Sequence, residues 1–342
     1  MVSPSYIVYA DFETVLERVD TQISNTNTLL QKHVPSMAAY LFVPMQHGAE
    51  TLMPLDYKVF YGPNCISDFL TSLSNLAVEV GEWYQECANA PMTPLTAAHQ
   101  NDFKSTSVCY LCHKYLKISN KARDHDHVSG AYLGAAHKKC NLNRKQSKHL
   151  PVLFHNLRKY DMHFIMKYAS GVMGEWELSP IAQNTETFLA LTCRLPDKTA
   201  SQIRFIDSLQ FLLSSLDNLT KMMCPDDFIL SRQLPQWEGT IMKQVFPYSF
   251  ITDFNILDEQ RNSLPAYDDF YDTLRCKVVL TREEYAEACR KYQAWGCNSL
   301  REYSRFTSKW TSFCWQTAFS TFASWLWTMK DLNQLISFPS QA

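Results

Sequence analysis

The chain has 342 residues, 46% of them hydrophobic and only nine of them glycine, which is typical of a folded globular protein with one large or two ordinary domains. No apolar run approaches the roughly 18 residues that span a bilayer, and the first residues lack the layout of a signal peptide, so we expect an intracellular protein of the nucleus or cytoplasm, not secreted and with no membrane partner. The formal net charge of −2 does not indicate a nucleic-acid partner, and the eleven cysteines suggest thiols or metal ligands rather than disulfides.

The order of predicted strands and helices indicates an α/β layered domain. Residues 5–10 predict a short buried strand, and residues 66–84 carry apolar side chains at helical spacing. The Thr-Arg-Glu-Glu run that begins 281–295 resembles a capping box that opens a helix. Further strand-like runs lie at 36–45, 57–61, 151–155, 187–194 and 201–206.

Residues 98–149 interrupt this pattern and predict a small module inserted between two strands. They are polar and basic, and cysteines and histidines cluster within them. Residues 104–148 hold ten Lys or Arg against two Asp, a local excess of positive charge that suits a surface facing phosphates. A solvated lysine-rich loop would carry the same charge, so that alternative stays open.

Two pairs of soft donors in this module form a four-ligand set that suits tetrahedral zinc. The pairs are Cys109-x2-Cys112 and His137-x2-Cys140, and each can bind the ion from a tight turn. A module of this size has too little core to hold itself together, so a structural metal is physically sensible. We therefore predict that these four side chains hold a structural Zn²⁺.

A second set of side chains lies between and after these pairs. Asp124 and Asn141 offer oxygen ligands for a hard divalent ion, and His125 can deprotonate water, which together suit metal-assisted phosphodiester cleavage. The runs Cys-x2-Cys, Asp-His-Asp-His-x2-Gly and Gly-Ala-Ala-His-x2-Cys-Asn resemble the recombination endonuclease VII group of HNH nucleases.

That resemblance implies zinc at the four Cys and His ligands, Mg²⁺ at Asp124 and Asn141, His125 as the general base and His127 at the phosphate. One departure from the family is Leu133, which stands where Arg is usual, so a phosphate contact is in doubt. The alternative to cleavage is a zinc-stabilised DNA-binding knob.

Asp11 and Glu13 stand two residues apart at the end of the first predicted strand, so both carboxylates project to the same face. Such a pair can hold divalent ions, Mg²⁺ or Mn²⁺, that activate water and stabilise the leaving oxygen in phosphodiester hydrolysis. The Asp-x-Glu pattern alone is common by chance, so its meaning depends on the motifs that accompany it.

Residues 154–165, Phe-His-Asn-Leu-Arg-Lys-Tyr-Asp-Met-His-Phe-Ile, resemble the second exonuclease motif of family B DNA polymerases, and Asp-Phe-Glu-Thr at 11–14 resembles the first. The resemblance implies metal binding by Asp11, Glu13 and Asp161. It also implies that Asn156 contacts the single-stranded 3′ end of DNA. In isolation, Asp161 would be a helix N-cap and Asn156 a turn residue.

Residues 205–212 resemble the Ser/Thr-Leu-x2-hydrophobic element of protein-primed polymerases. The resemblance implies that Ser208 and Leu209 contact single-stranded DNA and a priming terminal protein, and a buried strand end is the alternative. The later order of Phe-Pro-Tyr at 246–248, Leu-Pro and the helix near 281–295 is similar to polymerases of Maverick (Polinton) mobile elements, which also carry an endonuclease VII-like insert.

The family's third exonuclease motif, Tyr-x3-Asp, should follow Tyr303 closely, but residues 307–342 contain no such pattern. Reading the codons from the third base of the Phe306 codon permits Tyr-Leu-Lys-Val-Asp, with the Asp forced by the Trp310/Thr311 codon junction. Our hypothesis is that the reading frame is lost there, so that 307–342 is an aberrant tail that packs badly and exonuclease turnover is weak or absent. A native amphipathic segment is the alternative.

We therefore expect an RNase H-like α/β domain with a 3′→5′ exonuclease site, formed by residues 1–97 and 150–306, and an inserted ββα-metal module at 98–149. By resemblance, the chain is a fragment of a protein-primed family B DNA polymerase that acts in DNA replication and proofreading, without the polymerase domain. The alternatives are an HNH endonuclease that cuts branched DNA through the insert and a non-catalytic DNA-binding remnant held by zinc.

Overall fold

The computed structural model of the chain defines the positions of most residues. It describes residues 4–22, 28–45, 54–87, 91–127, 129–144, 149–184, 187–196, 201–229, 232, 245–272, 276–278 and 280–328.

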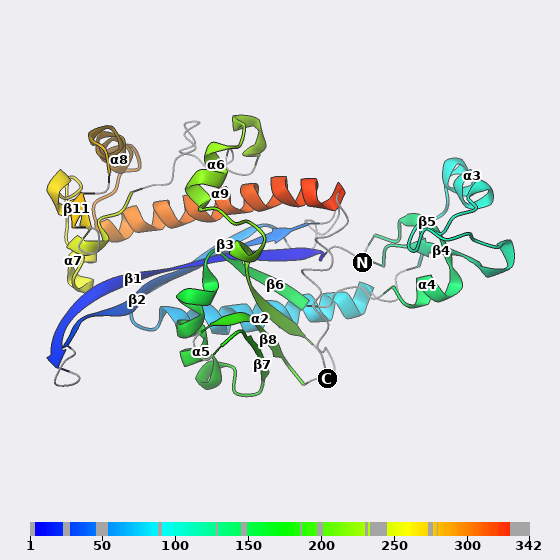
Figure 1. The fold of residues 1–342 in the computed structure, drawn as a ribbon, viewed down its shortest axis with the longest axis horizontal. Helices are drawn as coiled ribbons and strands as arrows, with labels where there is room; N and C mark the ends of the chain where they lie inside the picture. The colour runs from blue at the N-terminus through cyan, green and yellow to red at the C-terminus, as the bar shows by residue number, and fades with distance from the viewer. Residues whose placement is uncertain are drawn as a thin grey trace.

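A seven-stranded mixed sheet forms the centre of the molecule (Figure 1). The strands in spatial order are β3 (Asp56–Tyr61), β2 (Thr28–Pro44), β1 (Tyr6–Gln22), β6 (His149–Phe154), β9 (Gln202–Asp207), β8 (Phe188–Arg194) and β7 (Glu177–Ala182). β1 is antiparallel to β2 and parallel to β6, and β6 is parallel to β9. This arrangement confirms a mixed α/β fold, and each predicted strand-like run lies in one of its strands with at most one residue outside it.

A β-bulge interrupts the pairing of β1 with β2 beside Glu13. Glu13 pairs with Met37 but Thr14 pairs with Pro35, so Ser36 is an extra residue in β2. The Ser36 hydroxyl donates to the Glu13 carbonyl oxygen over 3.2 Å, and the Gly62 amide donates to the Ser36 carbonyl oxygen over 3.0 Å. The extra residue therefore has defined hydrogen-bond partners, as bulges near functional sites commonly do.

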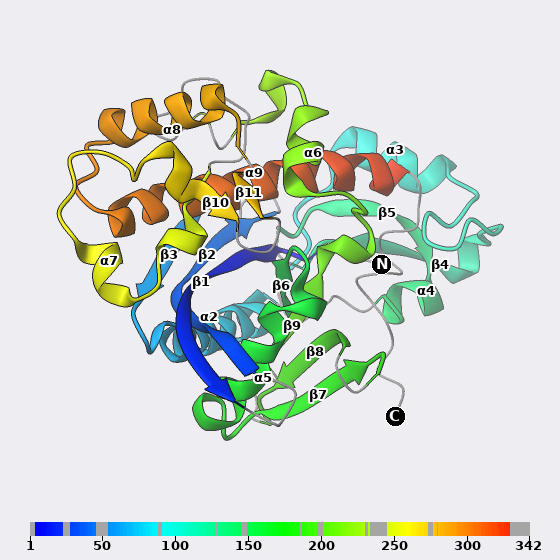
Figure 2. The same ribbon diagram turned by 60° about the vertical axis from the view of Figure 1, so that its left-hand side comes forward.

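Helices cover both faces of the sheet (Figures 1 and 2). On one face lie α2 (Cys65–Cys87) and α5 (Asp161–Val172), and on the other lie α6 (Leu216–Lys221) and α9 (Leu300–Thr328). The apolar side chains predicted to lie on one helical face of α2 are buried against the sheet, which confirms that prediction. They are Ile66, Phe69, Leu70, Leu73 and Leu76.

A third apolar cluster lies around the start of α9 and holds the predicted helix α8 (Arg282–Ala294). Its capping box is formed as expected: the Glu284 amide donates to Thr281 Oγ1 over 3.1 Å, and the Thr281 amide donates to Glu284 Oε2 over 2.7 Å. The smaller elements of this region are η6 (Tyr248–Phe250), α7 (Phe254–Asp258), η7 (Tyr267–Phe270), β10 (Tyr271–Asp272) and β11 (Lys277–Val278).

The inserted module stands apart at one end of the molecule (Figure 1). It contains α3 (Ala97–Ser105), η1 (Ile118–Asn120), β4 (Lys121–His125), β5 (Tyr132–His137) and α4 (Lys138–Leu142). Its own apolar cluster is small and is centred on Cys109, Leu116, Ala135 and Ala136. The chain leaves the main domain after α2 and returns at β6, so the module is an insertion between elements of one sheet.

Short 3-10 turns follow the two central parallel strands: η2 (Leu157–Lys159) after β6 and η3 (Ser208–Gln210) after β9. A further turn, η4 (Pro225–Asp227), follows α6. No helix among the described residues combines the length and the apolar character needed to cross a bilayer.

The segment after Phe306 was expected to pack badly, but where the structure describes it the chain continues as a helix that buries apolar side chains. α9 runs across Phe306 without a break. Apolar side chains of its later part are buried against the sheet, where they contact residues of β1, β2, β6 and β9: Trp310, Phe313, Cys314, Trp315, Ala318 and Phe319. The physical reason is their spacing of three and four residues, which puts most of them on one helical face. Residues 329–342 lie outside the described part of the chain.

Phe313→Ala should lower the free energy of unfolding by about 3 kcal/mol, because it removes a large buried ring and leaves a cavity. Urea denaturation followed by tryptophan fluorescence measures this loss. The matched control is Leu213→Ala, at a side chain that is 84% exposed, and its effect should stay within about 0.5 kcal/mol. Equal stabilities of the two variants would show that this part of α9 is not packed on the sheet.

Candidate functional site

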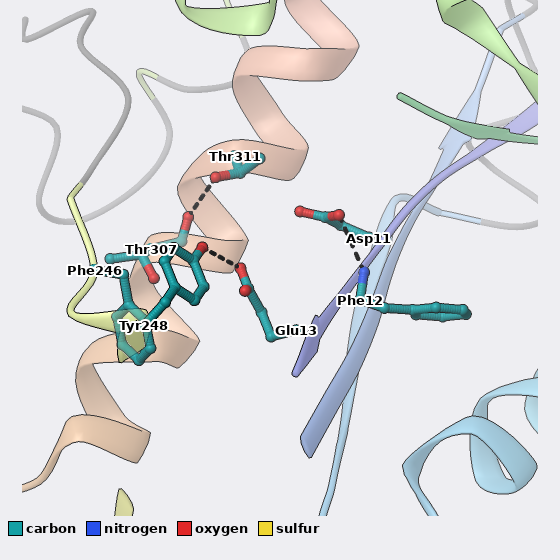
Figure 3. A pocket seen from close by; sticks show the side chains of 7 residues that line it. All are labelled: Asp11, Phe12, Glu13, Phe246, Tyr248, Thr307 and Thr311. Carbon is teal, nitrogen blue, oxygen red and sulfur yellow. Dashed lines mark hydrogen bonds between the residues drawn. The ribbon is translucent and has the colours of Figure 1, made fainter. Parts of the chain in front are cut away.

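An acidic pocket lies between β1 and α9. Figure 3 shows Asp11 and Glu13 projecting from the strand toward the helix, with Phe12 directed to the opposite side. The cavity has a volume of about 130 Å³, and its lining residues are Asp11, Phe12, Glu13, Phe246, Tyr248, Thr307 and Thr311. Phe12 is buried, and its ring lies 5.0 Å from the ring of Phe69 and 4.9 Å from that of Phe154. The period of two along a strand thus anchors β1 in the core and presents both carboxylates to the pocket.

Tyr248 closes one side of this pocket and was missed by the sequence analysis as a site residue. Its hydroxyl donates to Glu13 Oε1 over 3.3 Å (Figure 3). Desolvation, together with the charges of Glu13 and Asp11, raises the pKa of Tyr248 well above its ordinary value. The hydroxyl therefore stays protonated and can serve as a donor to the carboxylate.

Asp161 is the third predicted acidic residue and is the first residue of α5. Tyr160 occupies the N-cap position, so Asp161 is not the cap residue of this helix. Burial raises the pKa of Asp161 well above its ordinary value, and the charges of Asp11, Glu13 and Asp207 raise it further. The fold thus brings Asp161 into the electrostatic field of the two β1 carboxylates.

The three carboxylates are not drawn together tightly. Among the described residues, Asp11, Glu13 and Asp161 do not form a group whose ligand oxygens all lie within 4.8 Å of one another. The negative charges of Asp11 and Glu13 nevertheless repel an ionised Asp161 in this partly buried site. A bound cation would offset this repulsion and would favour the ionised form of Asp161.

Asp207 joins the loops that follow the two central parallel strands, and no role was predicted for it from the sequence. It is fully buried at the end of β9. Its Oδ1 accepts from the amides of Asn156 (3.0 Å) and Leu209 (2.9 Å), and its Oδ2 accepts from the amide and Nε of Arg158 (both 3.1 Å). Asn156 has a left-handed backbone, with φ of 70°. An Asp directly after an apolar run was the signal that could have identified it.

The residues predicted to contact DNA differ in exposure. Asn156 is exposed and Leu209 is half-buried. Ser208 is buried, and its hydroxyl donates to the carbonyl oxygen of Phe154 over 2.6 Å. Ser208 therefore joins the ends of β6 and β9 in this structure, while Asn156 and Leu209 present atoms at the surface.

Tyr160 lies beside the acidic pocket and belongs to a network that the sequence analysis missed. Its hydroxyl lies 2.8 Å from Thr14 Oγ1 and 2.5 Å from Nδ1 of His33. Because Thr14 is on β1 and His33 is on β2, this hydroxyl joins the N-terminus of α5 to both strands. The three residues are far apart in sequence, so no local pattern indicates their contact.

The predicted zinc ligands converge in the inserted module. One donor atom from each of Cys109, Cys112, His137 and Cys140 lies within 4.8 Å of the others. His137 Nδ1 lies 3.4 Å from the Cys112 sulfur and 3.7 Å from the Cys140 sulfur. The other ring nitrogen, Nε2, lies 2.9 Å from the carbonyl oxygen of Tyr115. Three thiols and an imidazole held by its second nitrogen are a donor set that fits a structural Zn²⁺.

The pKa of the Cys109 thiol is lower than that of an ordinary cysteine, which favours the thiolate form that binds metals. Burial raises its pKa, but the backbone amides of Cys112, His137 and Leu111 outweigh that effect and lower the pKa to about 6. Burial and the neighbouring thiols raise the pKa of Cys140 to about 11. Cys109 therefore ionises near neutral pH, and a bound divalent ion would favour the thiolate form of the cluster.

Asp124, the predicted Mg²⁺ ligand of the module, is hydrogen-bonded and ion-paired to other side chains of the module. Asp124 is buried, and its Oδ2 accepts from the Tyr110 hydroxyl over 2.5 Å and lies 3.4 Å from Nη1 of Arg144. Arg144 also donates to the Tyr110 hydroxyl over 3.1 Å. One oxygen of Asp124 is thus engaged by an ion pair that the sequence analysis did not anticipate.

The remaining predicted nuclease residues are more accessible. His125, His127 and Asn141 are half-buried, and the rings of His125 and His127 lie 4.9 Å apart. Leu133, at the position where a basic residue was expected, is exposed. A side chain at Gly134 would place its Cβ 2.8 Å from the Tyr110 ring, so glycine is needed there to let Tyr110 reach Asp124.

Comparison with known proteins relates part of the chain to DNA polymerases. Residues 140–293 match the family model of DNA polymerase type B, organellar and viral. Over 157 residues, 44% of this chain, the sequence is 30% identical to a probable DNA polymerase of Ascobolus immersus, and the chain spans 11% of that relative's length. Phi29 DNA polymerase complexed with primer-template DNA is a structural neighbour, with 10% sequence identity and a TM-score of 0.30, over 64% of this chain and 23% of the other.

Cys112→Ser should abolish stoichiometric zinc binding and lower the melting temperature of the protein, because zinc supplies much of the folding energy of such a small module. Metal analysis of the purified protein and a thermal melt check this expectation. Cys224→Ser, at an exposed cysteine outside the cluster, should retain one zinc per chain. Retention of zinc by the Cys112 variant would contradict the assignment.

Proposed function

We propose that this chain is the 3′→5′ exonuclease region of a family B, protein-primed DNA polymerase that acts in DNA replication. The match of residues 140–293 to the organellar and viral type B family supports this reading. A mixed sheet with β1 between antiparallel β2 and parallel β6 supports an RNase H-like arrangement. The four-ligand cluster inserted between α2 and β6 supports a polymerase of the Maverick (Polinton) type.

The acidic pocket is the observation that carries this proposal. Asp11 and Glu13 face it from β1, and Asp161 lies within their electrostatic field. These residues would hold Mg²⁺ or Mn²⁺, which when bound would activate water and stabilise the leaving oxygen of a phosphodiester. Tyr248 would keep Glu13 oriented toward the pocket through its hydrogen bond.

The proposed substrate is the single-stranded 3′ end of DNA. Asn156 is exposed in the loop after β6, and its left-handed backbone is fixed by Asp207. Leu209 follows β9 on the neighbouring loop, where Asp207 also holds its amide. Both loops lie at the carboxyl ends of parallel strands, a common location for ligand binding. A priming terminal protein is the proposed protein partner of the Ser208-Leu209 element.

Two threonines of the pocket stand at the positions where the reading-frame hypothesis puts the third exonuclease motif, Tyr-x3-Asp. Thr307 and Thr311 lie on α9 and line the pocket opposite Asp11 and Glu13 (Figure 3). In the shifted frame, the Tyr of Tyr-x3-Asp falls at position 307 and the Asp falls at position 311. The proposed exonuclease thus lacks one carboxylate in the sequence as it stands, and we expect weak turnover.

A second candidate function is a DNA-binding knob formed by the zinc module. The ion pair between Asp124 and Arg144 favours this role over phosphodiester cleavage, because it engages an oxygen that a Mg²⁺ site would need. Cleavage of branched DNA, with His125 as the base and His127 at the phosphate, remains the competing proposal for this module.

Asp11→Ala should abolish any release of terminal nucleotides from single-stranded DNA in the presence of Mg²⁺ or Mn²⁺, because it removes a proposed metal ligand. Gel analysis of 5′-labelled oligonucleotides measures this release. His125→Ala is the matched variant in the other proposed site: it should leave terminal release unchanged and should abolish internal cuts in junction DNA if the module cleaves. Unchanged nucleotide release by the Asp11 variant would refute the exonuclease proposal.

Thr311→Asp should increase nucleotide release by roughly 10-fold or more, because it adds a carboxylate that faces Asp11 and Glu13 across the pocket. The same gel assay, with Mn²⁺ titrated, reports both the rate and the metal concentration needed. Thr71→Asp adds the same charge at an exposed position of α2 and should change neither. A Thr311 variant that folds but gains nothing would argue against the frame hypothesis.

A further inference from the structure

The zinc module exposes apolar side chains beside lysines on one loop, residues 113–118, which we name the knuckle loop. Tyr115 is 71% exposed and Ile118 is 89% exposed. Lys114 and Lys117 are also exposed, whereas Leu116 between them is buried in the small core of the module. The loop therefore presents an aromatic ring and an aliphatic side chain to solvent, and an exposed lysine precedes each of them in the sequence.

The zinc cluster fixes the backbone of this loop. The Cys109 amide donates to the Lys114 carbonyl oxygen over 2.9 Å, and the His113 amide donates to the Cys109 carbonyl oxygen over 2.8 Å. The carbonyl oxygen of Tyr115 lies 2.9 Å from Nε2 of His137. The exposed side chains thus project from a backbone tied to two of the proposed metal ligands, so a partner would pay little ordering entropy to contact them.

The positive charge around the knuckle loop indicates the kind of partner that it could bind. Residues 103–123 contain five Lys or Arg and no Asp or Glu. An isolated exposed apolar side chain is normal, but an aromatic ring flanked by lysines on an acid-free stretch is complementary to a nucleic-acid strand. Lysines neutralise phosphates, and an aromatic ring stacks on an unpaired base whatever its sequence.

We propose that the knuckle loop binds single-stranded DNA: Lys114 and Lys117 contact phosphates, Tyr115 stacks on an unpaired base, and Ile118 packs beside that base. The proposal rests on the DNA-binding part of the proposed function, but it does not depend on the acidic pocket. The module lies apart from α9 and the sheet (Figure 1), so the loop contacts a stretch of strand separate from the 3′ end in the pocket.

The test measures binding of the full chain to a fluorescent 30-nucleotide single strand and to a blunt duplex, without added Mg²⁺ or Mn²⁺, over a series of salt concentrations. The Tyr115→Ala/Ile118→Ala variant should bind the single strand roughly 10-fold more weakly, with the same salt dependence and little change on the duplex. The Lys114→Ala/Lys117→Ala variant should weaken binding to both, and its log–log salt slope should fall by about 0.7 per lysine on the single strand. Tyr115→Phe should retain wild-type affinity.

The matched control is Leu142→Ala, at a side chain of the same module that is 83% exposed but lies on α4. Each variant must retain one zinc per chain, which separates loss of contact from loss of folding. Wild-type affinity of the Tyr115/Ile118 variant, or an equal loss in the Leu142 control, would overturn the inference and leave the proposed function intact. If the wild-type protein binds no DNA, both the knuckle-loop inference and the proposed function fail. If the Tyr115/Ile118 variant loses affinity as expected but the wild type releases no nucleotides, only the exonuclease proposal fails.

Discussion

The buried carboxylate of Asp207 is the interaction on which the arrangement of the main site depends. β6 and β9 are parallel neighbours, and each is followed by a loop that must turn away from the sheet without hydrogen bonds from a strand partner. Asp207 accepts from the amides of Asn156, Arg158 and Leu209, and the Arg158 side chain balances its charge. A buried charge paired and hydrogen-bonded on both oxygens is stable, whereas an unpaired one is costly. It fixes both loops and hence the direction in which α5 begins.

The acidic pocket results from local alternation combined with long-range packing. The period of two along β1 puts Asp11 and Glu13 on one face and Phe12 in the core, and at the bulge beside Glu13 the Ser36 hydroxyl donates to the Glu13 carbonyl oxygen. The opposite wall comes from α9, almost 300 residues later in the chain. Mixed sheets with sequence-distant walls bring together groups that no short motif contains.

The parts of this site that are local in sequence could be predicted, and the parts that depend on tertiary packing could not. Spacing of a few residues was enough to predict the convergence of the four proposed zinc ligands, the strand with Asp11 and Glu13, the face of α2 and the capping box at Thr281. The contact of Tyr160 with His33 and the ion pair of Asp124 with Arg144 require a fold before they exist. We expected the segment after Phe306 to pack badly, but apolar spacing alone is enough to bury one face of α9 in its described part.

The composition of α9 nevertheless conflicts with its location. Among the residues of this helix whose side chains are described, six polar ones are buried: Ser304, Thr307, Ser308, Ser312, Gln316 and Thr317. Within the described residues, Ser312 Oγ and Trp315 Nε1 are buried without a hydrogen-bond partner, which costs free energy that a selected core avoids. Positions 307 and 311 are four residues apart, so they lie on one helical face and both reach the pocket. A Tyr and an Asp at these two positions would put polar groups where the site can use them. The position of α9 therefore suits a Tyr at 307 and an Asp at 311 better than the two threonines that are present. A reading frame that shifted near Phe306 would produce this mismatch.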